Sequence, residues 1–228
     1  MITSKSNPKI KNVVKLQKSS ERRDQNRIII EGIREIERAV ACGFIIDTLF
    51  ICNEILKESI DIKANIIEEV TLEVFEKIAY REGSDGLLAV AIPKYADLKD
   101  FKPKKNPLII VLETVEKPGN LGAVMRTADA AGVDAVIITD PRTDLFNPNA
   151  IRASIGTIFS VPLFACSSEE CIEWLKANDI KIYCTYLKAS IDYLEADFRE
   201  GSAIVMGTEA TGISDIWVEV ADQNLIIP

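Results

Sequence analysis

The chain has 228 residues, of which 47% are hydrophobic and 27% are charged, and its formal net charge is −8. This composition is typical of a globular protein of one large or two small domains, and no apolar run reaches the roughly 18 residues of a membrane span, so no membrane association is expected. The absence of histidine excludes Ser-His-Asp and Cys-His hydrolases and HExxH metalloproteases. The five cysteines form no C-x-x-C pair, so we predict neither a disulfide framework nor a metal site.

Positive charge is concentrated at the N-terminus. Residues 1–27 contain eight basic and two acidic residues, a net charge of +6, so the other 201 residues carry −14. Such a segment can contact phosphates, but a solvated, lysine-rich first helix explains it as well, and composition alone favours the helix. The first 18 residues lack the apolar segment of a secretory signal, which indicates a cytoplasmic protein.

Residues 1–92 are predicted to form a small α/β domain. Apolar periodicity gives, in chain order, strand 27–31, a helix that ends before Gly43, strand 45–51, a short polar helix from Asn53, strand 64–67, a helix over 72–79 and strand 86–92. Residues 93–107 contain five lysines with little apolar periodicity, which predicts an interdomain linker.

Residues 108–228 are predicted to form a doubly wound parallel sheet. The predicted elements are strand 108–112, helix 121–131, strands 135–139 and 161–165, helix 169–177, strands 181–186 and 203–206, helix 214–220 and strand 225–227. The first two strands are almost continuously apolar, as expected where both faces of a sheet are buried. The predicted fold class is therefore α/β, with a small N-terminal α/β domain ahead of a C-terminal parallel-sheet domain.

The most informative stretch is 112–128, LETVEKPGNLGAVMRTA, which runs from a buried strand through a Pro-Gly turn into a helix. We expect Asn120 to cap this helix, where free amides and the helix dipole favour an anionic group. Arg126 lies two turns into an otherwise apolar helix, and spacing alone favours an ion pair with Asp129. Small residues such as Gly122 let the helix approach a ligand, a partner subunit or the sheet, of which the sheet is the safer expectation.

A second stretch, 203–214 with the sequence AIVMGTEATGIS, places the carboxylate of Glu209 directly after a strand. Ligands of open α/β sheets bind at the carboxyl ends of the strands, which makes this loop a candidate site. A tight loop in which Glu209 caps the helix from Ser214 is the alternative. The G-x-G-x-x-G fingerprint is absent after the first strand of both domains, which argues against a nucleotide-dependent oxidoreductase.

Together these stretches resemble the SpoU (TrmH-like) class of RNA methyltransferases. The family's P-x-N-x-G motif matches 118–122 and its helical arginine matches Arg126, while its G-[ST]-E-x-x-G-[IL]-S loop matches 207–214. Between them, 152–159, RASIGTIF, is similar to the family's A-S-x-G segment that precedes a strand. The first ninety residues resemble the substrate-binding domain of rRNA-type members, so the resemblance covers nearly the whole chain.

The resemblance implies S-adenosylmethionine-dependent methylation of a ribose 2′-hydroxyl in structured RNA, with ribosomal RNA as the expected substrate. It also implies a catalytic domain folded as a deep trefoil knot, a homodimer formed through that domain, and a cofactor held by the backbone of the knot loops. Carried over, the cofactor-binding residues are Leu187, Gly207, Gly212, Ile227 and Pro228. The family's third motif begins at an Ile-Pro like Ile227-Pro228 and continues into a Ser-Leu-Asn segment and a helix, so we expect a tail beyond Pro228 that closes the knot.

The catalytic residues implied by the resemblance are Arg126, Asn120 and Glu209. A guanidinium is almost always protonated, so we expect Arg126 to bind the adjacent RNA phosphate and to stabilise the developing alkoxide rather than to act as a simple base. Asn120 would hold the loop, and Glu209 would orient Arg126 or the hydroxyl.

The basic N-terminal arm is the expected RNA-contacting element. The residues assigned to it are Lys5, Lys9, Arg22 and Arg23. A non-catalytic RNA-binding or assembly protein that kept the fold is the alternative to an enzyme, and titration with S-adenosylmethionine separates the two.

Overall fold

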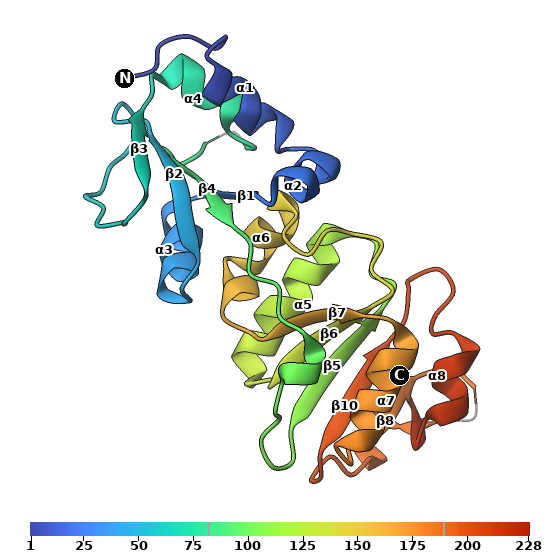
Figure 1. Ribbon diagram of the computed structural model, residues 1–228. Helices are drawn as coiled ribbons and strands as arrows, with labels where there is room; N and C mark the ends of the chain where they lie inside the picture. Colours follow the sequence, from blue (N-terminus) through green and yellow to red (C-terminus); the bar gives the residue numbers. More distant parts are fainter. Residues whose placement is uncertain (82, 189) are drawn as a thin grey trace. The chain divides into compact units, whose positions relative to one another are not determined.

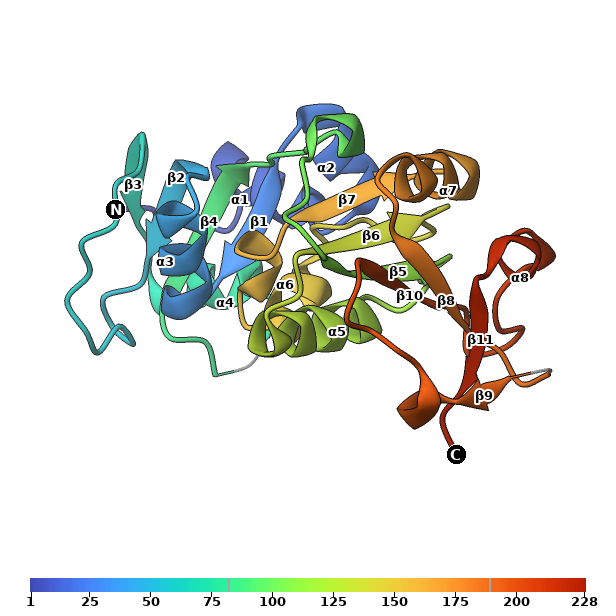
Figure 2. The ribbon, with the colours of Figure 1, turned by 90° about the horizontal axis from the view of Figure 1, so that it is seen from below.

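The computed structural model describes residues 1–81, 83–188 and 190–228. The chain divides into two compact units, of which unit 1 comprises Met1–Lys94 and Asp144–Ser160, and unit 2 comprises Tyr95–Thr143 and Val161–Pro228. Both units combine helices with a sheet (Figures 1 and 2), which confirms the predicted α/β class with a parallel-sheet C-terminal part. The domain boundaries 1–92, 93–107 and 108–228 stay predictions, as does the trefoil knot.

Unit 1 is built on a four-stranded mixed sheet in the order β1-β4-β2-β3. Its strands are β1 (Ile28–Glu31), β2 (Ile45–Ile51), β3 (Ile66–Glu69) and β4 (Leu87–Ile92), and its first helices are α1 (Pro8–Lys15), α2 (Ser19–Gln25), α3 (Ile33–Ala41) and α4 (Leu72–Ile78). β4 runs antiparallel to both β1 and β2. Isoleucine dominates the strands, as its stiff branched side chain favours a pleated, half-buried surface. Ile10 of α1 and Phe75 of α4 join the core of this sheet.

Two predictions in the N-terminal part differ from the structure. The residues from Asn53 form turns rather than a short helix. The chain is held there by the backbone of Cys52, which donates to the Gly86 carbonyl at 2.9 Å and accepts from the Leu56 amide at 3.0 Å. β3 begins at Ile66, two residues later than predicted.

Segment Asp144–Ser160 belongs to unit 1, although its position in the sequence lies inside the predicted C-terminal domain. It contains α6 (Pro148–Ser154) and the short 3-10 helix η2 (Thr157–Phe159). Its two phenylalanines, Phe146 and Phe159, pack edge-on against Phe44, with ring centroids 5.7 and 4.8 Å away. This aromatic cluster explains the assignment, because three buried rings contribute a large apolar area and a favourable edge-to-face geometry.

Unit 2 contains a seven-stranded parallel sheet in the order β7-β6-β5-β10-β8-β11-β9. The strands are β5 (Leu108–Glu113), β6 (Ala135–Thr139), β7 (Leu163–Cys166), β8 (Lys181–Thr185), β9 (Ile191–Asp192), β10 (Ser202–Met206) and β11 (Gln223–Ile226). The helices are α5 (Pro118–Ala131), α7 (Ser168–Ala177) and α8 (Asp215–Val220), with short 3-10 turns η1 (Leu98–Asp100) and η3 (Tyr193–Glu195).

Helices cover both faces of this sheet, α7 and α8 on one face and α5 on the other (Figure 2). The core between the sheet and α7 and α8 includes Val111, Val205 and the fully buried Trp217. From β5 the chain steps through β6 to β7 on one side, and β10 and β8 lie on the other side. The strand order therefore reverses next to β5, and ligands of open parallel sheets bind at the carboxyl ends of strands at such a point.

Arg22 is one of the most buried charged residues, with 3% of its surface exposed. Its Nε donates to Asp144 Oδ2 at 2.7 Å, and its Nη1 donates to the carbonyls of Leu16 and Gln17 at 2.8 Å each. A buried guanidinium is stable only where it is paired with acceptors in this way. Arg22 thus ties the N-terminal arm to the segment that begins at Asp144.

Replacement of Asp144 by asparagine should destabilise unit 1, because it leaves the buried Arg22 charge without its anionic partner. We expect a loss of about 3 kcal/mol in the free energy of unfolding, which is the lower end of the range for removing one partner of a buried ion pair. Urea unfolding followed by circular dichroism measures it. The matched control is Glu200→Gln, which removes the partner of Lys181 from an exposed pair and should leave unfolding unchanged. An unchanged midpoint for Asp144→Asn would contradict this account of Arg22.

Candidate active site

The two motif-bearing loops start at the same edge of the unit 2 sheet. β5 and β10 are parallel neighbours, with Met206 opposite Leu112, so the loops that follow them leave the sheet together. They enclose a cavity of about 320 Å³ that is lined by 112–117, Asn120, Val124 and 206–210. A larger cavity lies elsewhere in unit 2, but this one sits at the topological switch point and holds the motif residues. It is the candidate active site.

Glu209 joins the two loops. Its Oε1 accepts a hydrogen bond from Asn120 Nδ2 at 2.6 Å, and its Oε2 forms an ion pair with Lys117. The hydrogen bond from Lys117, followed by that from Asn120, lowers the pKa of the Glu209 carboxyl, and Glu209 in turn raises the pKa of Lys117. The contact is therefore lost only as the pH falls through the lowered pKa of Glu209 or rises through the raised pKa of Lys117, so it is intact across the neutral range.

The sequence predicted that Asn120 caps this helix and left a cap on the helix from Ser214 as the alternative role of Glu209, and the structure shows neither cap. α5 begins at Pro118 with Lys117 at the N-cap position, so Asn120 lies inside the first turn. Its side-chain amide donates to Glu209 instead of capping the helix. Proline at the first helical position has no N–H, so the first turn of α5 has one unpaired amide fewer. The helix from Ser214 is held by Glu113 rather than by Glu209, because Glu113 accepts from the Ser214 amide at 2.8 Å and from its hydroxyl.

Glu113 is a site residue that the sequence reasoning missed. It is the last residue of β5, is 7% exposed and lines the cavity. Its two bonds to Ser214 fasten the far end of the glycine-containing loop to the central strand. A carboxylate that ends an otherwise apolar strand is the signal that could have identified it, since a buried charge needs paired donors.

The loop 207–212 closes on itself. The Thr208 amide donates to the Gly212 carbonyl at 3.0 Å, the Gly212 amide donates to the Thr208 carbonyl at 3.1 Å, and Gly212 has a φ of +71°. A Cβ at Gly207 would lie 2.1 Å from the carbonyl carbon and oxygen of Gly212. Glycine is therefore required at position 207 by contact distance and favoured at position 212 by backbone conformation.

Arg126 does not line the cavity and does not pair with Asp129. It is exposed on α5, and no ion pair or hydrogen bond of its guanidinium is found among the residues that the structure describes. The outward face of α5 also presents small residues, including Ala123, Ala130 and Ala131, whereas Gly122 and Ala128 face the sheet. The expectation that the small residues serve packing on the sheet thus holds for only part of the helix.

The residues assigned to the cofactor lie at one sheet edge. Leu187, Gly207 and Ile227 follow β8, β10 and β11, which are parallel neighbours in the order β10-β8-β11. Thr185 Oγ1 donates to the Val205 carbonyl at 3.0 Å, and the Tyr186 amide donates to the Leu225 carbonyl at 3.0 Å, so the ends of these strands are linked. Leu187 and Ile227 are 85% and 63% exposed. Gly207 alone of the three lines the 320 Å³ cavity.

The residues assigned to RNA differ in accessibility. Lys5 and Lys9 are exposed but form ion pairs with Glu73 and Glu68, and Arg23 is exposed. Arg22 is buried, and its Nε and Nη1 donate to acceptors of its own unit, so its assigned RNA contact is replaced by a structural role. Arg22 and Arg23 are the same residue type at adjacent positions. Helix α2 directs the side chain of Arg22 into the protein and leaves that of Arg23 exposed.

Family comparisons identify the class of protein. The SpoU rRNA Methylase family matches residues 107–228, and an MRM3-like substrate binding domain matches residues 7–89. The Bacillus subtilis (strain 168) protein named 23S rRNA (guanosine(2553)-2'-O)-methyltransferase RlmP is 30% identical over 228 residues, which cover 100% of this chain and 90% of that protein. The chain belongs to the SpoU rRNA methylase family.

Solved structures agree with this assignment. A crystal structure described as an RNA 2'-O ribose methyltransferase is 36% identical with a TM-score of 0.88, and the match covers 100% of this chain and 89% of that chain. An AdoMet-bound rRNA methyltransferase from Sinorhizobium meliloti is 26% identical with a TM-score of 0.89, over 100% of this chain and 88% of that chain.

Among the residues that the structure describes, no helix is long and apolar enough to cross a membrane. Nor do three or more His, Cys, Asp or Glu side chains gather there in a group suited to a metal ion.

Replacement of Gly207 by alanine should open the loop, because the new methyl group would overlap the backbone of Gly212. We expect a loss of about 2 kcal/mol or more in unfolding free energy, as in other overpacked sites. Thermal and denaturant unfolding measure it. Gly119→Ala is the control, since a Cβ there has no atom within 4 Å. Equal stability of the two variants would show that the close approach of Gly207 to Gly212 is wrong.

Proposed function

We propose that this chain transfers a methyl group from S-adenosylmethionine to a ribose 2′-hydroxyl of structured RNA, and that the RNA is ribosomal. The observation that carries the proposal is the contact of Asn120 with Glu209, which brings the two family motifs to one cavity. Relatives that are named as methyltransferases, and that this chain matches over most of their length, support the proposal. The proposal places the reaction in the cytoplasm, where ribosomal RNA is available to a protein of this class.

The three loops after β8, β10 and β11 suit S-adenosylmethionine. They offer backbone groups and the exposed apolar side chains of Leu187 and Ile227 at one edge, together with Gly207, Gly212 and Pro228. Backbone amides and carbonyls can read a nucleoside, and apolar side chains can cover its adenine. When bound, the cofactor supplies an electrophilic methyl group on a sulfonium. The AdoMet-bound Sinorhizobium meliloti relative supports this assignment.

In the proposed mechanism the protein aligns the 2′-hydroxyl and stabilises the charge that develops on it. A ribose hydroxyl is a weak nucleophile, so alignment and removal or polarisation of its proton are needed. Arg126 holds the adjacent RNA phosphate and stabilises the alkoxide, while the proton passes to that phosphate or to solvent. Asn120 and Lys117 hold Glu209 charged beside the cavity, where its carboxylate orients the hydroxyl or the Arg126 guanidinium.

We further propose that the protein acts as a homodimer through unit 2. Arg126 is exposed and lies outside the cavity of its own chain, so a second copy that brings α5 to this cavity would complete the site. The small residues on the outward face of α5 permit such a close approach. This arrangement explains why a single chain leaves the proposed catalytic arginine in solvent.

RNA contact is assigned to the exposed residues of the basic arm, Lys5, Lys9 and Arg23. Phosphate contacts by such residues release counterions and are largely independent of sequence. Unit 1, which the substrate-binding family matches, would select RNA by shape and by its 2′-hydroxyls. The alternative, a non-catalytic RNA-binding protein, would need no cofactor, and titration with S-adenosylmethionine distinguishes it.

The experiment that tests the function is a map of 2′-O-methyl groups in ribosomal RNA. RNA from a strain that lacks the protein is compared with RNA from its parent. We expect one ribose mark to disappear and to return when the full chain is supplied again. An identical set of ribose marks in both strains would contradict the proposal.

Replacement of Arg126 by alanine should lower the rate of methyl transfer by at least about 100-fold, the loss seen when one charge-stabilising donor is removed from an active site. Cofactor affinity should stay unchanged, because Arg126 is exposed and is not among the residues that line the cavity of its own chain. Tritium transfer to ribosomal RNA and calorimetric titration measure the two quantities. Arg199→Ala, an exposed arginine of the same unit, should keep full activity. Full activity of Arg126→Ala would remove Arg126 from the mechanism.

Replacement of Arg23 by alanine should weaken RNA binding and reduce the slope of log affinity against log salt by about one, as expected for the loss of one phosphate contact. Fluorescence anisotropy with an rRNA fragment at several salt concentrations measures the slope. Lys63→Ala removes the same charge from an exposed site outside the arm and should leave the slope unchanged. Equal slopes for Arg23→Ala and the unaltered protein would exclude the arm as the contact.

A further inference from the structure

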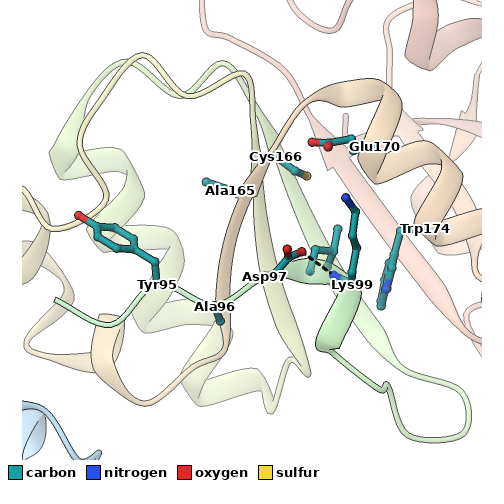
Figure 3. Close-up of a pocket in the computed structure, with 9 residues that line it drawn as sticks. Tyr95, Ala96, Asp97, Lys99, Ala165, Cys166, Glu170 and Trp174 are labelled. Atoms are coloured by element: carbon teal, nitrogen blue, oxygen red, sulfur yellow. Dashed lines mark hydrogen bonds between the residues drawn. The ribbon is translucent and has the colours of Figure 1, made fainter. Parts of the chain in front are cut away.

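Unit 2 contains a second cavity that the proposed function does not use. It has a volume of about 390 Å³ and lies between the η1 segment, the end of β7 and the first turns of α7. Figure 3 shows its walls, with Tyr95, Asp97 and Lys99 on one side and Cys166, Glu170 and Trp174 on the other. The cavity opens to solvent, and Cys166 is the only thiol among its lining residues.

A second thiol, that of Cys171, lies next to Cys166 on the core side of the cavity wall. Cys171 is fully buried in α7 and belongs to the core of unit 2, and the half-buried Cys166 packs against that core. The start of α7 is rigidly held, because Ser167 and Glu170 form a capping box across the turn between the two cysteines. The two thiols are hydrogen-bonded neighbours across this turn, with Cys166 lining the cavity and Cys171 buried in the core.

The two thiols differ in acidity. A hydrogen bond from Cys171 lowers the pKa of Cys166 below its ordinary value, even though burial and the carboxylates of Glu170, Asp140 and Asp97 oppose this. The same bond raises the pKa of Cys171, and burial raises it further. Figure 3 shows Lys99 and Glu170 on the walls of the same cavity as Cys166.

We propose that Cys166 is a site of reversible oxidation by hydroperoxides and that Cys171 is its resolving thiol. The cavity admits the small oxidant to Cys166, and the buried neighbour converts the product to an intramolecular disulfide. Thiols of this kind, accessible and next to a resolving cysteine, are the ones that oxidants select. The proposal does not depend on the methyltransferase assignment.

The steps balance with hydrogen peroxide as the oxidant. The Cys166 thiolate attacks one peroxide oxygen, an S–O bond forms as the O–O bond breaks, and the released hydroxide takes a proton to become water. The Cys171 sulfur then attacks the sulfenic sulfur, an S–S bond forms as the S–O bond breaks, and the hydroxide leaves as water with the Cys171 proton. Two thiols lose two electrons and one peroxide gains them, and a dithiol reductant restores both thiols.

The other cysteines provide internal controls. Cys184 is buried, and burial with the nearby carboxylates raises its pKa to about 12, so it stays a thiol. Cys52 is buried and Cys42 is half-buried in unit 1. Trypsin places Cys166 and Cys171 together in peptide 153–176, Cys42 and Cys52 in peptide 39–57, and Cys184 in peptide 182–188.

The test uses the purified full chain at neutral pH, exposed to hydrogen peroxide, unfolded, alkylated and analysed by mass spectrometry. We expect peptide 153–176 to become lighter by two hydrogen atoms and to take up no alkylating reagent, while peptides 39–57 and 182–188 are alkylated at every cysteine. Dithiothreitol should restore alkylation of both thiols. In Cys171→Ala, Cys166 should stop at the sulfenic acid, which dimedone captures.

Three outcomes would overturn the proposal. One is alkylation of both thiols in peptide 153–176 at peroxide doses that oxidise a free thiol in solution. Another is a first disulfide that joins different peptides. The third is equal oxidation of Cys184 and Cys166, which would show that the cavity and the neighbouring thiol confer no selectivity.

Discussion

The candidate site depends on one charged side chain that spans two loops. Glu209 accepts from Asn120 at 2.6 Å and pairs with Lys117, and it thereby fixes the start of α5 against the loop after β10. Parallel pairing of β5 with β10 brings these loops to one edge, and Glu113 anchors the other end of the glycine-containing loop through Ser214. Two carboxylates at neighbouring strand ends thus give the cavity its shape, and both act by accepting hydrogen bonds in defined directions.

Much of the fold could be predicted because apolar periodicity is strong where strands are buried on both faces. The strands 108–112 and 135–139 match β5 and β6 closely, and the two motifs predicted the loops that meet at the cavity. What failed depended on long-range contacts. Arg22 and Arg23 are adjacent in the sequence, yet only Arg22 is buried and paired with Asp144. Asp144 lies far along the chain, so local sequence could not reveal this pair. The role of Glu113 was missed for the same reason.

In this chain the environment of a residue, and not its type, decides whether the residue has a functional or a structural role. Arg126 is exposed on a helix that presents small side chains outward, so its proposed role requires a group from outside its own chain, an RNA or a second copy. Cys166 and Cys184 are both strand cysteines of unit 2, but one lines a cavity beside another thiol and the other lies in the core. Position relative to a cavity decides which of them can react.

The most direct test of the central claim is a double-mutant cycle on Asn120 and Glu209, with methyl transfer to ribosomal RNA as the measured rate. If the hydrogen bond between these side chains is what assembles the site, Asn120→Ala and Glu209→Ala each slow the reaction, and the double variant is no slower than the slower single variant. Fully independent losses, with the double variant slowed by the product of the two single effects, would contradict the account.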